Sequence, residues 1–167
     1  VACTNTGAAV IGNPDVGLPV VISDSIPAGS TYVGGSAAAG NTLPSGVTEY
    51  TILYSTNNAV SWSVAEPSPA TNVTHIQWWL SDPLQPGASG SVTFSVTVKT
   101  SPPPLIHNVA GLGLGTTTPF LEDDASTTIT GVRLISGTVF ADIGTGGGGY
   151  GNGIKDGTEA GITASTA

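Results

Sequence analysis

The sequence predicts an all-β fold, because short runs of alternating apolar and polar residues are separated by turn residues. The clearest alternation lies at residues 74–80, where Trp78 and Trp79 would point to opposite faces of a strand. Residues 91–99 alternate in the same way, and no stretch of useful length has the apolar spacing of a helix. We expect these two strands to be the central pair of an immunoglobulin-like β-sandwich with a C-terminal extension of one or two strands.

The remaining elements follow from turn signals along the chain. Residues 56–59 would close a hairpin between strands at 48–55 and 60–64. About seven to nine short strands separated in this way are typical of a sandwich. The expected strands of the first part of the chain are 1–4, 18–24, 31–33, 48–55, 60–64, 74–80, 91–99, 105–114 and 125–130.

The composition indicates an extracellular protein. Only 8% of the residues are charged, so serine, threonine, asparagine and glycine must supply most of the surface polarity. The net charge of −8, with three basic residues, argues against binding to nucleic acid or to an anionic membrane. No apolar run approaches the roughly 18 residues of a membrane span, so we expect none.

The single cysteine and the start of the chain each lead to a further expectation. Cys3 has no partner for a disulfide within the chain, so it is either buried in the first strand or available for an intermolecular bond. The chain starts inside an expected strand, at Val1, and shows no signal-peptide pattern. We therefore expect a mature or trimmed product.

Several short motifs follow one another in order between residues 1 and 132. They are Thr-Asn-Thr-Gly at 4–7, Ser-Asp-Ser-Ile-Pro-Ala-Gly-Ser-Thr-Tyr-Val at 23–33, Tyr-Ser-Thr-Asn-Asn-Ala-Val-Ser-Trp at 54–62, His-Ile-Gln-Trp at 75–78 with Pro-Gly at 86–87, and Ile-His-Asn-Val-Ala at 106–110. Together they resemble the DUF11-type repeat of prokaryotic surface proteins. The resemblance implies an immunoglobulin-like extracellular module, usually in tandem arrays, with no catalytic residues. The sequence departs from the pattern in having few residues before the first motif.

Residues 133–167 have a different character. A segment Gly-Thr-Val-Phe-Ala-Asp at 137–142 precedes a run of glycines at 146–149, and Asn-Gly-Ile-Lys-Asp-Gly-Thr-Glu-Ala-Gly-Ile follows at 152–162. This order resembles the opening of the SdrD B-like (Cna B-related) repeat of surface adhesins. Only the opening of that repeat is matched.

Residues 152–159 have the spacing of the second half of an EF-type calcium loop. With Gly153 at the sixth loop position, oxygen donors fall at the fifth, seventh, ninth and twelfth positions. The first half lacks such donors, and an acid before the glycine run would have to fold back to replace them. The resemblance implies the same side-chain ligands, so calcium is the expected cofactor; the alternative is a solvated acidic turn. The candidate ligands are Asp142, Asn152, Ile154, Asp156 and Glu159.

Other candidate residues can be interpreted as either structural or functional. The cluster Glu122–Asp124 is either a surface loop or a second cation site. His75 and His107 have no cysteine or carboxylate at a metal-ligand spacing, so ordinary strand histidines are favoured. No Gly-x-Ser-x-Gly motif occurs, and we expect no enzyme.

The three tryptophans, Trp62, Trp78 and Trp79, either fill the core and an interface or form a platform for stacking sugars.

The last 35 residues suggest how copies would associate. This tail, at 133–167, is too short for a core of its own, yet it contains strand candidates at 135–141 and 162–167. We expect the tail of one copy to complete the sandwich of the next by strand addition, giving an extracellular filament or surface array. The partners would be copies of the chain or neighbouring repeats; the alternative is a carbohydrate-binding or other ligand-binding adhesin module. The candidate interface residues are Val1, Cys3, Trp79, Val139, Phe140 and Ile162.

Overall fold

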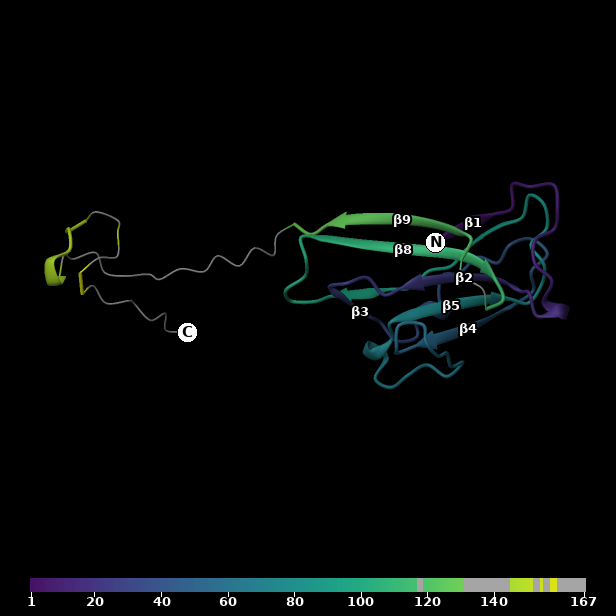
Figure 1. The fold of residues 1–167 in the computed structure, drawn as a ribbon, viewed down its shortest axis with the longest axis horizontal. Coiled ribbons are helices and arrows are strands. Elements are labelled where there is room, and N and C mark those ends of the chain that lie inside the picture. Colours follow the sequence, from purple (N-terminus) through teal and green to yellow (C-terminus); the bar gives the residue numbers. More distant parts are fainter. Residues whose placement is uncertain (117–118, 131–144, 152–153, 155–156, 159–167) are drawn as a thin grey trace. The chain divides into compact units, whose positions relative to one another are not determined.

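The computed structural model describes residues 1–116, 119–130, 145–151, 154 and 157–158 (Figure 1). The chain forms two compact units, Val1–Val132 and Arg133–Ala167. All strands of the described part belong to the first unit, and the second contributes the short 3-10 turn η4 (Thr145–Gly147). No helix in the described ranges is long and apolar enough to cross a membrane.

The larger layer of the first unit is a five-stranded antiparallel sheet. Its register places Ile22 opposite both Trp78 and Leu112, so these three side chains share the inner face. In Figure 1 the two longest strands lie along one side of this sheet. The strands, in spatial order, are β4 (Tyr50–Ser55), β5 (His75–Leu80), β2 (Val20–Ser25), β8 (Leu105–Leu114) and β9 (Leu121–Thr128).

The second layer consists of two short antiparallel pairs. One joins β1 (Ala2–Thr4) to β6 (Ser89–Ser91), and the other joins β3 (Ser30–Tyr32) to β7 (Val96–Val98). Three 3-10 turns connect the strands of this unit, and no longer helix occurs among the described residues. They are η1 (Pro14–Val16), η2 (Ser36–Ala38) and η3 (Ala70–Asn72). The prediction of an all-β sandwich is therefore confirmed.

The core between the layers is built around Trp78. This side chain is 0% exposed, and its indole N–H donates a hydrogen bond to the carbonyl of Ala37 at 3.0 Å. Burial of an indole removes a large apolar area from water, and the hydrogen bond satisfies its only polar atom. Phe94 packs beside it, with ring centroids 6.3 Å apart, and Ile76 is also fully buried. Of the two interpretations of the tryptophans, the core-filling one therefore holds for Trp78.

Three predictions about the elements are wrong. The segment 91–99 does not pair with β5, because β5 lies between β2 and β4 and the segment belongs to the opposite layer. Residues 60–64 form no strand; a single bridge joins Tyr54 to Ser63. The acidic cluster Glu122–Asp124 lies inside β9 rather than in a surface loop.

Candidate functional site

The edge strand β9 is the least covered element of the sandwich. All eight of its residues are exposed, although its register with β8 gives it one face on the side of the core. Leu121 lies opposite Leu112, and Ala125 lies opposite Asn108, so both belong to that inner face. An inner face exposed along a whole strand means that no strand of the described second layer lies over it.

The uncovered face forms one wall of a groove. One part of the groove encloses about 460 Å³ between β1 and the β8–β9 pair, and a second part encloses about 330 Å³ along β7. The two parts share Val1, Asn108 and Ala125, so they are continuous. Phe94 and Ile106 line the second part, which gives it an apolar floor.

The backbone of β7 contributes an unused hydrogen-bonding edge to this groove. Amides of successive strand residues point to opposite edges. The amide of Lys99 donates to the carbonyl of Gly29 at 2.9 Å, so odd-numbered residues face β3. No strand in the described part of the chain pairs with the other edge. Val96 and Val98 direct their backbone groups to that edge. Just before β7, the carbonyl of Ser95 accepts from the amide of Val33 on the β3 side, so the alternation gives Phe94 the same direction as Val96.

The first strand, β1, lies on the same edge, just beyond the unused stretch. The amide of Val92 donates to the carbonyl of Val1 at 2.9 Å, and the nitrogen of Val1 donates back to Val92 at 2.8 Å. The unused edge of β7 therefore continues the line of β1. A strand placed along it would extend the second layer opposite β9.

A buried acid lies in the wall of the groove. Asp24 on β2 is 3% exposed, and its Oδ2 accepts a hydrogen bond from Nδ2 of Asn108 at 3.1 Å. The other oxygens of this pair, Oδ1 of Asp24 and Oδ1 of Asn108, have no hydrogen-bond partner among the described residues. Burial raises the pKa of Asp24 to about 6. The hydrogen bond from Asn108, the positive charge of the N-terminus and the backbone amide of Ser25 oppose this effect only in part. The pair is therefore rich in acceptors and short of donors.

Two predicted interface residues line the groove, and the third described one does not. Val1 and Cys3 both belong to the groove wall. Burial raises the pKa of the Cys3 thiol, so this cysteine is a small apolar wall residue rather than a reactive thiolate. Trp79 lies on the outer face of the five-stranded sheet, half buried, where its indole N–H donates to Oε1 of Gln77 at 2.9 Å.

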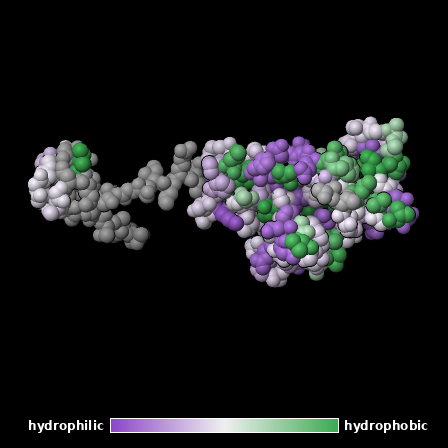
Figure 2. All heavy atoms as spheres, in the orientation of Figure 1, coloured by the Kyte–Doolittle hydropathy of each residue, from purple (hydrophilic) through white to green (hydrophobic). Residues whose placement is uncertain are grey.

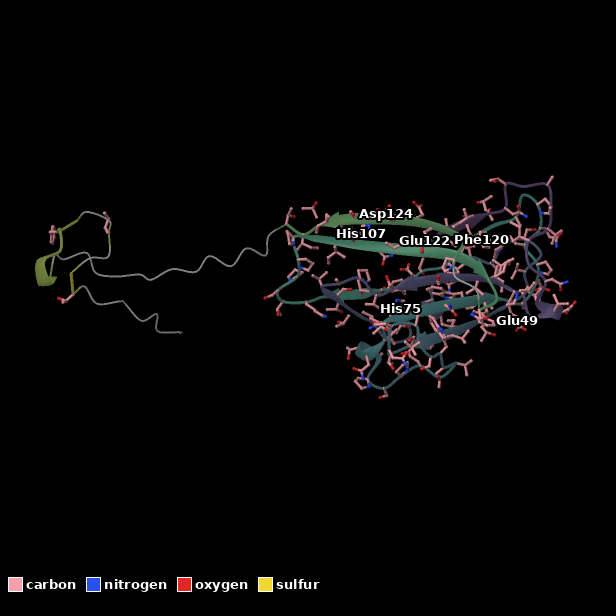
Figure 3. The ribbon with its side chains drawn as sticks, viewed as in Figure 1. Glu49, His75, His107, Phe120, Glu122 and Asp124 are labelled. Carbon is pink, nitrogen blue, oxygen red and sulfur yellow. The ribbon has the colours of Figure 1, made fainter. Side chains whose placement is uncertain are left out.

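The acids of β9 point to both faces of the sheet. Asp124 lies on the outer face, where its Oδ2 is 3.0 Å from Nε2 of His107 on β8 (Figure 3). Both side chains are more than half exposed, so this contact contributes little stability. Hydrophilic side chains gather over β8 and β9 in Figure 2. No group of three or more potential metal ligands occurs among the described residues, so the described part offers no support for a cation site at Glu122–Asp124.

A smaller hollow of about 320 Å³ lies on the outer face of the sheet. Trp62, His75 and Gln77 line it together with Glu122. Burial lowers the pKa of His75, so its ring is neutral at pH 7, and its Nδ1 lies 3.2 Å from Oγ1 of Thr74. These groups are of the kind that contact sugars, but the aromatic side chain is Trp62 rather than Trp79.

Most of the predicted residues of the second unit lie outside the described residues. This holds for the calcium ligands Asp142, Asn152, Asp156 and Glu159, and for the interface residues Val139, Phe140 and Ile162. Ile154, the predicted carbonyl ligand, is described and its side chain is 63% exposed.

The Asp24–Asn108 pair was missed by the reading of the sequence. A signal was present, because Asp24 continues the inner-face alternation of Val20 and Ile22 along one strand. An acid at such a position is buried, and buried acids need a partner.

Comparisons of the chain with protein-family models, with curated protein sequences and with solved structures find no match.

Proposed function

We propose that this chain is a structural, non-enzymatic subunit of an extracellular filament or surface-protein array, in which copies join head to tail by strand complementation. The observation that carries this proposal is the unused edge of β7 above an apolar groove. Exposed strand edges pair with other chains unless they are covered or charged. Here the edge ends in line with β1, at Val1, so an added strand would fit the existing layer.

An added strand would gain both backbone and side-chain interactions. Its amides and carbonyls would pair with those of Phe94, Val96 and Val98. Its inward side chains would enter the groove beside Ile106, and each buried valine or isoleucine contributes about 1.5–3 kcal/mol. The same strand would cover the inner face of β9, which is exposed at present.

A second copy of the chain supplies a suitable strand. The sequence at 133–141 is rich in β-branched and aromatic residues, with Ile135, Thr138, Val139 and Phe140, and it follows β9 closely along the chain. A contact between the tail of one copy and the groove of another is heterologous, since it joins two different surfaces. Heterologous contacts propagate into open filaments when the rotation between successive copies does not close a ring.

A pair of proline variants of the full-length chain tests the use of this edge. Val96→Pro removes an amide that points to the unused edge, so we expect a folded protein that no longer assembles. Thr97→Pro removes an amide that faces β3 and should lower the melting temperature instead. Light scattering and electron micrographs report assembly. Filaments of normal length from a folded Val96→Pro variant would contradict the proposal.

Calcium belongs to the same proposal through the acidic loop of the second unit. If Asp156 and Glu159 hold a calcium ion, the ion would stiffen the joint between copies. Filaments treated with a chelator should then become shorter or more flexible in electron micrographs. Unchanged filaments would contradict a role for calcium at the joint but would not contradict strand complementation.

Carbohydrate binding is the second candidate, and the hollow lined by Trp62, His75 and Gln77 favours it. An aromatic ring beside polar side chains suits the faces and hydroxyls of sugars. A glycan array tests carbohydrate binding. It would be probed with the wild-type chain, with Trp62→Ala and, as the matched control, with Trp79→Ala. Binding that only Trp62→Ala removes would support this function; no binding by any of the three would exclude the glycans tested.

A further inference from the structure

We propose that the Asp24–Asn108 pair is an anchor that selects the incoming strand by receiving its single cation, Arg133 of a second copy. This inference rests on the proposed function, since it concerns the same groove. It identifies the residues that would determine which strand binds in the groove and in which register. The groove is formed entirely by described residues, and the occupant is the segment 133–141 of another copy.

The anchor is incomplete in the isolated unit. Asp24 is 3% exposed, yet its Oδ1 has no partner among the described residues, and neither has Oδ1 of Asn108. Both residues line the part of the groove that runs along β7. Buried polar atoms without partners are rare and costly. A ligand that enters the groove with donors at this point would remove that cost.

The chemistry of the pair selects a cation with several donors. A carboxylate oxygen and an amide oxygen both accept hydrogen bonds and offer none. A guanidinium group has five N–H donors in a planar fork and can serve two acceptors at once. It also neutralises the carboxylate, whose charge is otherwise held away from water. Asp123 on β9 lines the adjoining part of the groove and makes it more acidic.

The positive charge of the N-terminus already acts on Asp24 but is held by the carbonyl of Val92. Of the three basic side chains, only Arg133 has the right surroundings. Lys99 directly follows β7 in the unit that forms the groove, and its side chain is exposed. Lys155 is next to Asp156 in a glycine-rich sequence. In a strand of this sequence, Arg133 would share one face with Ile135, Gly137 and Val139. That face would carry a single cation among apolar residues. That face matches a groove with one acid in an apolar wall.

Variants of the full-length chain test the anchor from both sides. Arg133→Gln should raise the concentration needed for assembly by about tenfold or more, because it leaves the buried acid unpaired. Asp24→Asn should weaken assembly as strongly while keeping or raising the melting temperature of the subunit. The matched controls are Lys99→Gln and Asp15→Asn, which change the same charges at exposed positions and should leave assembly unchanged.

Mixing the two variants identifies the copy that supplies the strand. Asp24→Asn keeps an intact tail and Arg133→Gln keeps an intact groove, so a mixture should form dimers through one normal junction at concentrations where neither variant associates alone. Fluorescence transfer between differently labelled variants measures this association. Absence of dimers in the mixture would overturn the pairing between copies.

The outcomes separate this inference from the proposed function. If Arg133→Gln and Asp24→Asn assemble like their controls while Val96→Pro does not, strand complementation holds and the anchor is wrong. If Val96→Pro also assembles normally, the proposed function fails first. If Val96→Pro, Arg133→Gln and Asp24→Asn all fail to assemble alone, and the mixture of the last two forms dimers, the results support both strand complementation and the anchor.

Discussion

Asp24 is the residue at which stability and association oppose each other. It occupies an inner-face position on β2, between Ile76 of β5 and Ala110 of β8, where an apolar side chain would pack better. Burial raises its pKa to about 6 from an ordinary value near 3.8, because the charged form loses water. Between these two values the folded subunit binds more protons than the unfolded chain. The stability of the subunit therefore rises as the pH falls from 6 to 4.

Asp24→Asn should make the isolated subunit more stable at neutral pH. The amide carries no charge to desolvate, so we expect a gain of about 1–3 kcal/mol at pH 7, where the carboxylate of the wild type is ionised. The gain should fade between pH 6 and pH 4, because the wild-type carboxyl becomes neutral over that range. Denaturant unfolding at pH 4 and pH 7.5 measures both values. Equal gains at both pH values would show that the buried charge is not the cause.

Trp78 and Trp79 are neighbours in sequence with opposite structural roles. Trp78→Ala should cost about 3–5 kcal/mol, because it empties the centre of the core and removes the hydrogen bond to Ala37. Trp79→Ala should cost much less, since its side chain is only partly buried on the outer face. Thermal unfolding of the two variants checks the contrast. Similar losses for both would mean that the outer face is also buried in solution.

The groove strand β1 carries the only cysteine of the chain, which makes it a natural reporter. Cys3 lines the groove wall, and its raised pKa makes it a slow nucleophile at pH 7. We expect labelling by a neutral thiol reagent to slow further when copies assemble, since an added strand narrows access to the groove. Labelling rates measured above and below the concentration of assembly test this. A rate that does not change with assembly would place the added strand elsewhere.

At the scale of elements, the sequence predicted strand positions well and strand partners poorly. Residues 105–114 are predicted as a strand and form β8, although the segment contains two glycines, because it lies between a proline run and a turn. The expected pairing of 74–80 with 91–99 failed because the ten-residue link between them crosses from one layer to the other. Alternation shows which faces are apolar, but it does not show which strand lies beside which.

The strand β9 shows a second limit of sequence reading. Its acidic residues suggested a loop, because adjacent carboxylates repel each other. They are tolerated in a strand here because all three are exposed, with successive side chains on opposite faces of an edge strand. Tertiary position decided the outcome, since the same cluster in a central strand would be buried.

For the whole molecule, the fold class followed from the sequence, whereas the groove did not. Turn chemistry and alternation are local, and they were sufficient to predict a sandwich. The groove lies between β1, β7 and the β8–β9 pair, which come together only in the assembled layers. Asp24 and Asn108 are 84 positions apart in the sequence, so their pairing required the register of β2 against β8.

In the proposed assembly, a second copy adds a strand to the free edge of β7. Hydrogen exchange of the full-length chain, measured above and below the concentration of assembly, tests it most directly. The amides of Phe94, Val96 and Val98 should exchange slowly only in the assembled sample, while that of Lys99, already bonded to Gly29, should change little. Equal exchange of the first three amides in both samples would contradict strand complementation at this edge.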